Sequence, residues 1–220
     1  MALKQVNLPS TVTSIENSVF ANCSALTEIT IPSKITSLGD YVFDCCSALK
    51  TINLPEGLTS IGEFAFCSCK TLTGITIPST VTSIGSTAFA DCEALAAIEL
   101  PDGLESIGSW VFQECKALKT ITIPEKVTTI QEYFFEQCAE LTTVTFKGKI
   151  GSIGEKAFQN CAKLTDLYLQ GCESLPTLAS DAFSGVSQKV TVHLSSDLND
   201  KVTSDANYSA WESVATFTAD

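Results

Sequence analysis

Arginine is absent from this sequence of 220 residues, and its 13 basic side chains, all lysines, are outnumbered by 25 acidic ones. The resulting net charge of −12 argues against nucleic acids and anionic membrane surfaces as partners, because both need a basic footprint. No apolar run approaches the roughly 18 residues of a membrane-spanning helix. The opening "MALKQVNLP" also lacks the pattern of a signal peptide. We therefore expect no nucleic-acid partner and no membrane insertion by this segment.

The side chains from which catalytic sites are built are also scarce. Histidine occurs once, and we expect His193 to be an exposed strand residue without a catalytic partner. No nucleophile motif, phosphate loop, HExxH motif or CxxC pair occurs. Carboxylates such as Glu99, Glu114 and Glu136 are scattered, as on a solvated surface. The sequence therefore predicts no enzymatic activity, no cofactor and no metal.

What the sequence does have is a repeat with a period of 23 residues. Four residue types keep this step along the chain, and a fixed period of this length indicates a solenoid. Prolines recur at Pro9, Pro32, Pro55, Pro78, Pro101 and Pro124, phenylalanines at Phe20, Phe43, Phe66, Phe89, Phe112, Phe135 and Phe158, cysteines at Cys23, Cys46, Cys69, Cys92, Cys115, Cys138 and Cys161, and leucines at Leu26, Leu49, Leu72, Leu95, Leu118, Leu141 and Leu164.

The unit "LKTITIPEKVTTI" shows how each coil is expected to form. Ile121 and Ile123 alternate with threonines, which predicts a half-buried strand. Pro124 ends that strand because it has no N–H for the ladder. Val127 and Ile130 form a second apolar pair, a candidate short strand on another side of the coil. The next turn, "AF..C", fits one turn of 3₁₀ or α-helix.

A glycine follows the second apolar pair in five units, at Gly39, Gly62, Gly85, Gly108 and Gly154. A glycine at this position predicts a bend with positive φ. Glu16 and Gln131 occupy the same position in two other units, so the bend is not restricted to glycine.

Equivalent strands of successive coils are expected to stack in parallel at about 4.8 Å. Their side chains would then form ladders through the core, a nearly one-dimensional arrangement. The fold class predicted is a right-handed repeat solenoid with one long parallel β-sheet, short second strands and 3₁₀ or helical turns. The main strands should begin near Leu3, Leu26, Leu49, Leu72, Leu95, Leu118, Leu141, Leu164 and Lys189.

The unit "L-x-x-I-x-I-P-x-x-V-x-x-I-G-x-x-A-F-x-x-C-x-x-L" resembles the BspA-like leucine-rich repeat, over about residues 3–194. Lys147 departs from the pattern where proline is expected, and the last unit is longer, with Phe183 lying 25 residues after Phe158. The resemblance implies a leucine-rich-repeat module, on the cell surface or secreted, that binds a protein partner or an extracellular-matrix component. It carries no catalytic site.

The repeat register stops after Leu194, so we divide the chain into a solenoid over residues 1–194 and a C-terminal cap over residues 195–220. Tyr208, Trp211, Val214 and Phe217 recur at steps of three, as in an apolar helical stripe that would cover the last coil. The first residues already align within a repeat. Either upstream repeats have been removed, or the first strand is an open edge.

The seven cysteines in register are best interpreted as buried small hydrophobes. Three others lie outside the register, at Cys45, Cys67 and Cys172. Cys45 and Cys67 fall on the same turn of adjacent coils, so a surface disulfide between them stays open as an alternative. Free thiols in this number fit a reducing or anaerobic setting.

Two surfaces are candidates for binding. One is the outward face of the main strands, rich in threonine, which β-propensity alone would explain. The other is the position two residues before the repeated phenylalanine, where Tyr41, Phe64, Trp110 and Tyr133 form an aromatic stripe along the solenoid. Aromatic rings dominate interface hot spots. The same rings could instead lie over the neighbouring turn and shield the core.

Acidic residues near the stripe, at Asp40, Glu63, Glu132 and Glu155, would favour a partner with basic patches. The function expected is non-enzymatic adhesion or protein binding. Two alternatives remain at this point. One is an architectural spacer in a larger surface protein, and the other is a glycan-binding module that stacks sugars on the stripe.

Overall fold

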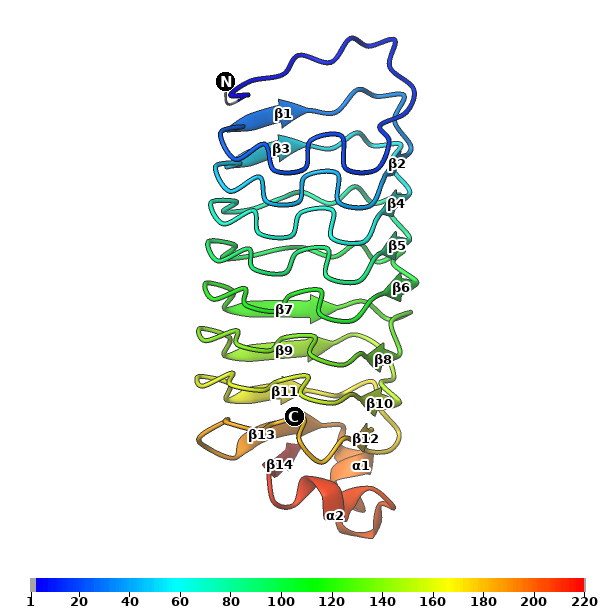
Figure 1. The fold of residues 1–220 in the computed structure, drawn as a ribbon. Coiled ribbons are helices and arrows are strands. Elements are labelled where there is room, and N and C mark those ends of the chain that lie inside the picture. The colour runs from blue at the N-terminus through cyan, green and yellow to red at the C-terminus, as the bar shows by residue number, and fades with distance from the viewer. Residues whose placement is uncertain (1–2, 220) are drawn as a thin grey trace.

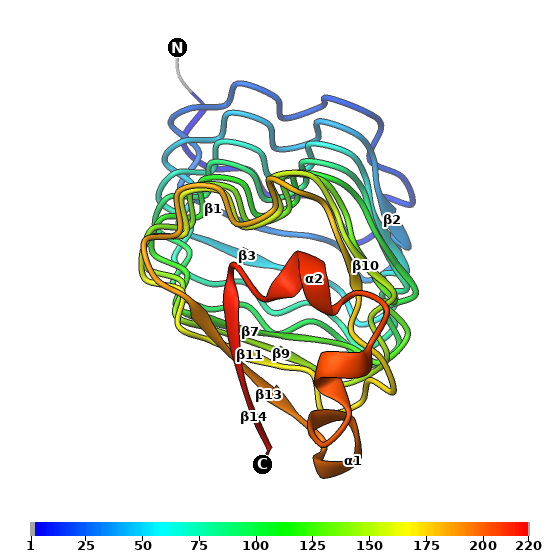
Figure 2. The ribbon, with the colours of Figure 1, turned by 90° about the horizontal axis from the view of Figure 1, so that it is seen from below.

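In the computed structural model, which describes residues 3–219, the chain winds into a stack of coils that rises along one axis (Figure 1). Viewed along the axis, each coil has a side formed by the main strands, a side formed by the short second strands, and a side of stepped turns (Figure 2). Paired strand residues are mostly 23 positions apart, as in Glu28 with Thr51 and Thr120 with Thr143. The solenoid and its period are therefore confirmed.

The main strands pair in parallel on one side of the stack. They are β1 (Glu28–Thr30), β3 (Thr51–Asn53), β7 (Thr120–Ile123), β9 (Thr143–Phe146), β11 (Asp166–Tyr168), β13 (Val190–Leu194) and β14 (Ala215–Ala219). Their inward residues are buried and their outward residues are more exposed, as the alternation in sequence predicts.

The expectation of one long sheet is wrong in one respect, because the main sheet is interrupted. The strands β1 and β3 form one sheet, and β7, β9, β11, β13 and β14 form another. Between these sheets, the main-strand positions of two coils form an isolated bridge, Thr76 with Glu99, in place of a pair of strands. Those coils carry Gly74 and Ala97 at the outward position that is threonine in β3, β7 and β9. Glycine and alanine are poor strand formers, which explains the break.

The short second strands are present as expected, each two residues long. One sheet contains β2 (Ser37–Leu38), β4 (Ser60–Ile61), β5 (Ser83–Ile84) and β6 (Ser106–Ile107), and another contains β8 (Thr129–Ile130), β10 (Ser152–Ile153) and β12 (Thr177–Leu178). In all but β12, a polar residue is followed by a buried isoleucine or leucine that enters the core.

The third side differs from the expected helical turn. Among the described repeats it consists of separate i→i+3 turns, such as Asp44 N–H to Tyr41 O and Cys46 N–H to Phe43 O. Left-handed residues recur twice in each of seven successive coils here, as at Tyr41 (φ 59°) and Cys45 (φ 58°). A helix cannot continue through such residues, because every helical residue needs negative φ.

The repeated glycines do not have the predicted positive φ. Among the glycines of residues 3–219, only Gly185 has φ in the left-handed region. The glycines after the second strands are needed for space instead. A Cβ on Gly62 would lie 2.6 Å from the carbonyl carbon of Gly39 in the preceding coil, closer than real Cβ contacts come.

Inside the coils, the repeated phenylalanines form a continuous stack, with neighbouring ring centroids 5.0 to 5.9 Å apart. Beside them, six of the seven in-register cysteines are fully buried, and only Cys23, in the first coil, is half-buried. Each buried one donates its thiol hydrogen to the carbonyl oxygen of the ladder phenylalanine in the preceding coil, for example Cys115 Sγ to Phe89 O at 3.2 Å. The cysteine ladder is therefore buried as predicted, but it also supplies hydrogen-bond donors.

The C-terminal segment packs across the end of the stack (Figure 2). It contains α1 (Ser196–Asn199), a 3₁₀ turn at Val202–Ser204, and α2 (Tyr208–Trp211) before β14. Trp211 is fully buried against Phe183, and its indole N–H donates to Pro176 O at 2.8 Å. The expected helical stripe ends early, because Phe217 lies in β14, which pairs in parallel with β13.

Candidate binding surfaces

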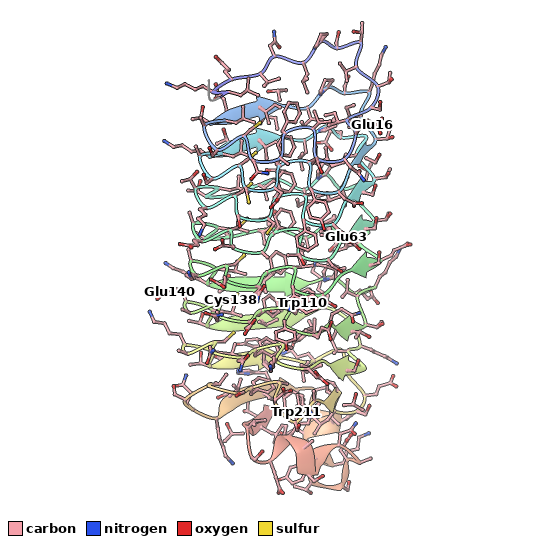
Figure 3. All side chains as sticks on the ribbon, in the orientation of Figure 1. Glu16, Glu63, Trp110, Cys138, Glu140 and Trp211 are labelled. Carbon is pink, nitrogen blue, oxygen red and sulfur yellow. The ribbon has the colours of Figure 1, made fainter. Side chains whose placement is uncertain are left out.

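The aromatic stripe lies on the stepped-turn side of the solenoid, and Figure 3 labels Trp110 there. Each stripe residue occupies the first left-handed position of its coil, with φ between 55° and 59°. Its backbone N–H is directed along the axis and donates to the next coil, as in Tyr41 to Glu63 O (2.8 Å) and Trp110 to Glu132 O (3.2 Å). The backbone therefore fixes the direction in which each ring leaves the coil.

The structure brings the four predicted rings together as two pairs. Tyr41 stacks on Phe64 with centroids 4.6 Å apart and planes 7° from parallel. Trp110 stacks on Tyr133 at 5.2 Å and 27°. Between the pairs, the equivalent residue is Thr87, which is almost fully buried, so the stripe is divided at this coil.

The rings are partly, not fully, available to a partner. The Tyr41 residue is 39% exposed, whereas Phe64, Trp110 and Tyr133 are half-buried. In each pair, one face of each ring is covered by the other ring. Lys156 continues the second pair, with its ammonium 5.0 Å from the Tyr133 ring centroid and 3.1 Å from the Tyr133 hydroxyl.

The acidic residues expected near the stripe do not all behave alike. Asp40 is engaged by the fold, since its carboxylate accepts the backbone N–H of Glu63 at 2.9 Å. Glu63 and Glu155 are exposed, and Glu132 is half-buried. The exposed carboxylates can therefore contact a partner, while Asp40 links adjacent coils.

The second candidate surface, the threonine-rich face, carries the two largest depressions described on the molecule. One of about 930 Å³ lies over β1, β3 and the coil before them, and one of about 560 Å³ lies over the interruption of the main sheet. The depression of about 560 Å³ is bordered by an ion pair that the sequence analysis did not predict, between Lys147 and Asp102 (2.6 Å). The one signal in the sequence was the lysine that replaces the repeated proline.

His193 is not the exposed, unpartnered residue that we expected. Its side chain is 14% exposed, stacks on Tyr168 with centroids 4.0 Å apart, and lies 2.9 Å from Asp166. The register of β11 and β13 places Tyr168 opposite His193 and so creates the stack. Hydrogen bonding from the Thr165 side chain, and then from His193, lowers the pKa of the Asp166 carboxyl.

The cysteines outside the register are free thiols in this structure. Cys45 and Cys67 are half-buried, and the Cys45 N–H donates to Cys67 O at 2.8 Å. Burial raises the pKa of Cys67 to about 11. Cys172 is buried next to Ile150. Within residues 3–219, no group of three or more potential ligands is placed to hold a metal ion, and no helix is long and apolar enough to cross a bilayer.

The fold and its repeated ladders define a leucine-rich-repeat solenoid. The model of the BspA type leucine rich repeat region matches residues 1–99 and 83–209 in six copies. The chain therefore belongs to the BspA-type leucine-rich-repeat family.

Among solved structures, a leucine-rich-repeat protein of T. pallidum is similar at 30% identity and a TM-score of 0.66, covering 71% of this chain and 76% of that one. A leucine-rich-repeat protein of Bacteroides ovatus aligns over 98% of this chain and 91% of its own, at 20% identity and a TM-score of 0.47. No match was found among curated proteins.

Proposed function

We propose that this chain is a non-enzymatic binding module of a cell-surface or secreted protein, and that the aromatic stripe contacts a protein partner or an extracellular-matrix component. The observation that carries the proposal is the pair of ring stacks, Tyr41 on Phe64 and Trp110 on Tyr133, held at the surface by inter-coil hydrogen bonds. Rings that are already ordered lose little conformational freedom on binding. Aromatic side chains are also enriched among the residues that dominate interfaces.

The charge of the chain favours a protein over a glycan as the partner, and the ring stacks leave a sugar only part of the aromatic surface. Sugar rings bind by lying flat on an open aromatic face. In both pairs one face of each ring is covered by its neighbour, with planes 7° and 27° apart. Ring edges and the hydroxyls of Tyr41 and Tyr133 remain to contact side chains of a protein. The net charge of −12 favours a partner with basic patches.

The test is binding of the purified chain to a panel of extracellular-matrix proteins and glycans, compared with a Tyr41→Ser, Trp110→Ser, Tyr133→Ser variant. Serine suits this position, because Ser18 occupies it in the first coil with φ 62°. A matched control carries Thr120→Ser, Thr122→Ser and Thr143→Ser on the sheet face. Binding lost only in the stripe variant supports the proposal.

Binding that survives in the stripe variant but not in the control would transfer the site to the threonine-rich face. Absence of binding to every member of the panel, by a folded protein, would favour the architectural spacer. Folding of each variant is checked by its circular dichroism spectrum and by its urea midpoint, so that a lost interaction is not confused with lost structure.

A further inference from the structure

The 560 Å³ depression lies beside the break in the main sheet. Where Figure 1 shows two coils without main strands between β3 and β7, the outward positions hold Gly74 and Ala97. A Cβ added to Gly74 would meet nothing within 4 Å, so the sheet face is open there. The depression runs along the solenoid axis, with lining residues from Ile77 in one coil to Lys147 three coils later. It is an open groove on the sheet side, separate from the aromatic stripe.

Lys147 crosses this groove in an unusual way. Its ammonium donates to Asp102 at 2.6 Å, although the two residues are 45 positions apart and the coil of Pro124 lies between theirs. The other lysine–carboxylate pairs of the described chain join residues at most 24 positions apart. The groove therefore already holds one alkyl chain with a terminal cation, supplied by the protein itself.

This ion pair is exposed and exchangeable. The side chains of Lys147 and Asp102 are 50% and 81% exposed. Exposed pairs of this kind contribute little stability, because water and salt screen them. A cation from another molecule can therefore replace the Lys147 ammonium at Asp102 at little cost.

The charge around the groove is complementary to a cationic partner. The two depressions of the sheet face are lined by Glu28, Glu56, Glu99 and Asp102, and Lys147 is the one basic residue among their lining residues. No lysine of the described chain pairs with Glu99 within 4 Å. In the turns that precede the main strands, at their other end, lysines and carboxylates pair in a ladder, as Lys70, Glu93 and Lys116 do.

We propose that the groove over the sheet interruption docks an extended segment of a protein partner through a lysine or arginine side chain, which displaces Lys147 from Asp102. The incoming cation pairs with Asp102 and lies near Glu99, while its alkyl stem follows the path that the Lys147 stem takes. Lys147 gives the groove a modest preference for cationic segments, since a neutral segment would break the Lys147–Asp102 pair without replacing it. Acidic segments are disfavoured by repulsion from Asp102 and Glu99.

The dimensions suit a short peptide. The groove spans three coil spacings of about 4.8 Å, or roughly 14 Å. An extended chain covers that length with about four or five residues at 3.3 Å each. One or two cationic side chains of such a segment can reach the groove at a time, which matches the two carboxylates that line it.

The experiment uses an acetylated and amidated hexapeptide of alternating lysine and threonine, titrated into the ¹⁵N-labelled chain at low salt. A hexapeptide of alternating glutamate and threonine is the negative probe. We expect the lysine peptide to shift the amide signals of residues 97–100, 102 and 120–123, and added salt to weaken binding. Asp102→Asn should weaken binding about two- to five-fold, the range of an exposed ion pair. Lys147→Ala should strengthen it by a similar factor.

Two matched variants separate local contacts from the overall charge. Glu125→Gln removes one negative charge at the same corner of the solenoid, and Lys149→Ala removes one positive charge from a lysine that pairs with Glu173 instead. Both should bind the lysine peptide like the unmodified chain. Equal affinities for Asp102→Asn and Glu125→Gln, or for Lys147→Ala and Lys149→Ala, would overturn the proposal. Shifts confined to the stripe residues would overturn it too, and would leave the proposed function of the stripe intact.

Discussion

At the scale of single residues, the glycine after each second strand is dictated by the coil stacked against it. A Cβ added to Gly85 would lie 2.5 Å from the Glu63 nitrogen and 2.7 Å from the Gly62 carbonyl carbon. These neighbours are backbone atoms of the preceding coil, and hydrogen bonds hold them in turn, as Gly62 N–H donates to Leu38 O at 3.0 Å and Glu63 N–H to the Asp40 carboxylate at 2.9 Å. An alanine methyl at Gly85 would fit only if one coil moved away from the next, and that movement would disturb the hydrogen bonds between the coils.

Gly85→Ala should therefore lower the free energy of unfolding by about 1–3 kcal/mol, the usual cost of overpacking. Gly74→Ala is the matched control, because the added methyl would enter open space on the sheet face. It should be neutral or stabilise the fold by up to about 1 kcal/mol, since alanine restricts the unfolded chain. Urea denaturation of both variants checks the pair, and equal losses would show that glycine is not needed for close approach.

The thiols should fall into two classes of reactivity. Burial raises the pKa of the Cys69, Cys92, Cys115 and Cys138 thiols, which suppresses the thiolate that attacks a disulfide reagent. With an aromatic disulfide reagent at neutral pH, we expect the half-buried Cys23 and Cys45 to react first in the folded chain, and Cys67, whose pKa burial raises to about 11, to react more slowly. The remaining seven should react after denaturation. Fast reaction of more than three thiols in the native protein would mean that the coils open readily.

The left-handed residues show where sequence reasoning stops at this scale. Left-handed φ is normally inferred from glycine or asparagine. Here it falls on Tyr41, Phe64, Trp110 and even the β-branched Thr87 (φ 62°), none of which favours it. Inter-coil hydrogen bonds, such as Thr87 N–H to Ser109 O at 2.8 Å, hold these residues in place. Such bonds exist only after stacking, so the sequence positions of the stripe were predictable but the direction of its rings was not.

At the scale of the elements, the phenylalanine stack runs from coil to coil through the core. Phe112 is fully buried and stacks on Phe89 at 5.9 Å and on Phe135 at 5.8 Å. Phe134 also meets its ring, edge to face at 5.6 Å. The position of each phenylalanine in this ladder follows directly from the 23-residue period. The break in the main sheet, by contrast, depends on the weak strand propensity of Gly74 and Ala97, which the strong period obscured.

Phe112→Ala should destabilise the fold by about 3–5 kcal/mol, because it leaves a cavity that two rigid rings cannot close. Val19→Ala is the control, since the Val19 residue is 52% exposed and its loss should change stability by less than about 0.5 kcal/mol. Thermal and urea melts of both variants provide the measurement. A melt that barely moves for Phe112→Ala would contradict a tightly packed ladder.

At the scale of the whole molecule, the repeat makes the fold predictable, whereas the contacts that distinguish one coil from another involve residues that depart from the repeat. The period fixes which residues stack, because each coil contacts only its neighbours. Lys147 and Asp102 lie two coils apart, and no period relates a lysine at a proline position to an aspartate 45 residues earlier. The His193–Asp166 contact arises in the same way, from a diagonal between β11 and β13. Contacts of this kind appear only when the coils are placed in space.

Repetition also multiplies the effect of pH on the cysteine ladder. Burial raises the pKa of Cys46 and of Cys161 to about 12, and raises the pKa of the four thiols between them as well. In an unfolded chain these thiols would have pKa values of about 8.5. Between those values the unfolded chain holds fewer protons than the folded one, so stability is full below pH 8 and falls as the pH rises.

Each such thiol should lower the free energy of unfolding by about 1.4 kcal/mol per pH unit once the unfolded thiol has ionised. Urea denaturation between pH 7.5 and pH 10 should therefore show a steep loss of stability as the pH rises. Each buried cysteine of the ladder should contribute its own increment to the slope. A Cys115→Ala variant starts about 1–2 kcal/mol less stable, since it loses a packed sulfur and the hydrogen bond to Phe89 O. Its stability should nevertheless fall less steeply with pH, by one such increment. Identical slopes for the variant and the parent would mean that the ladder thiols do not govern the alkaline transition.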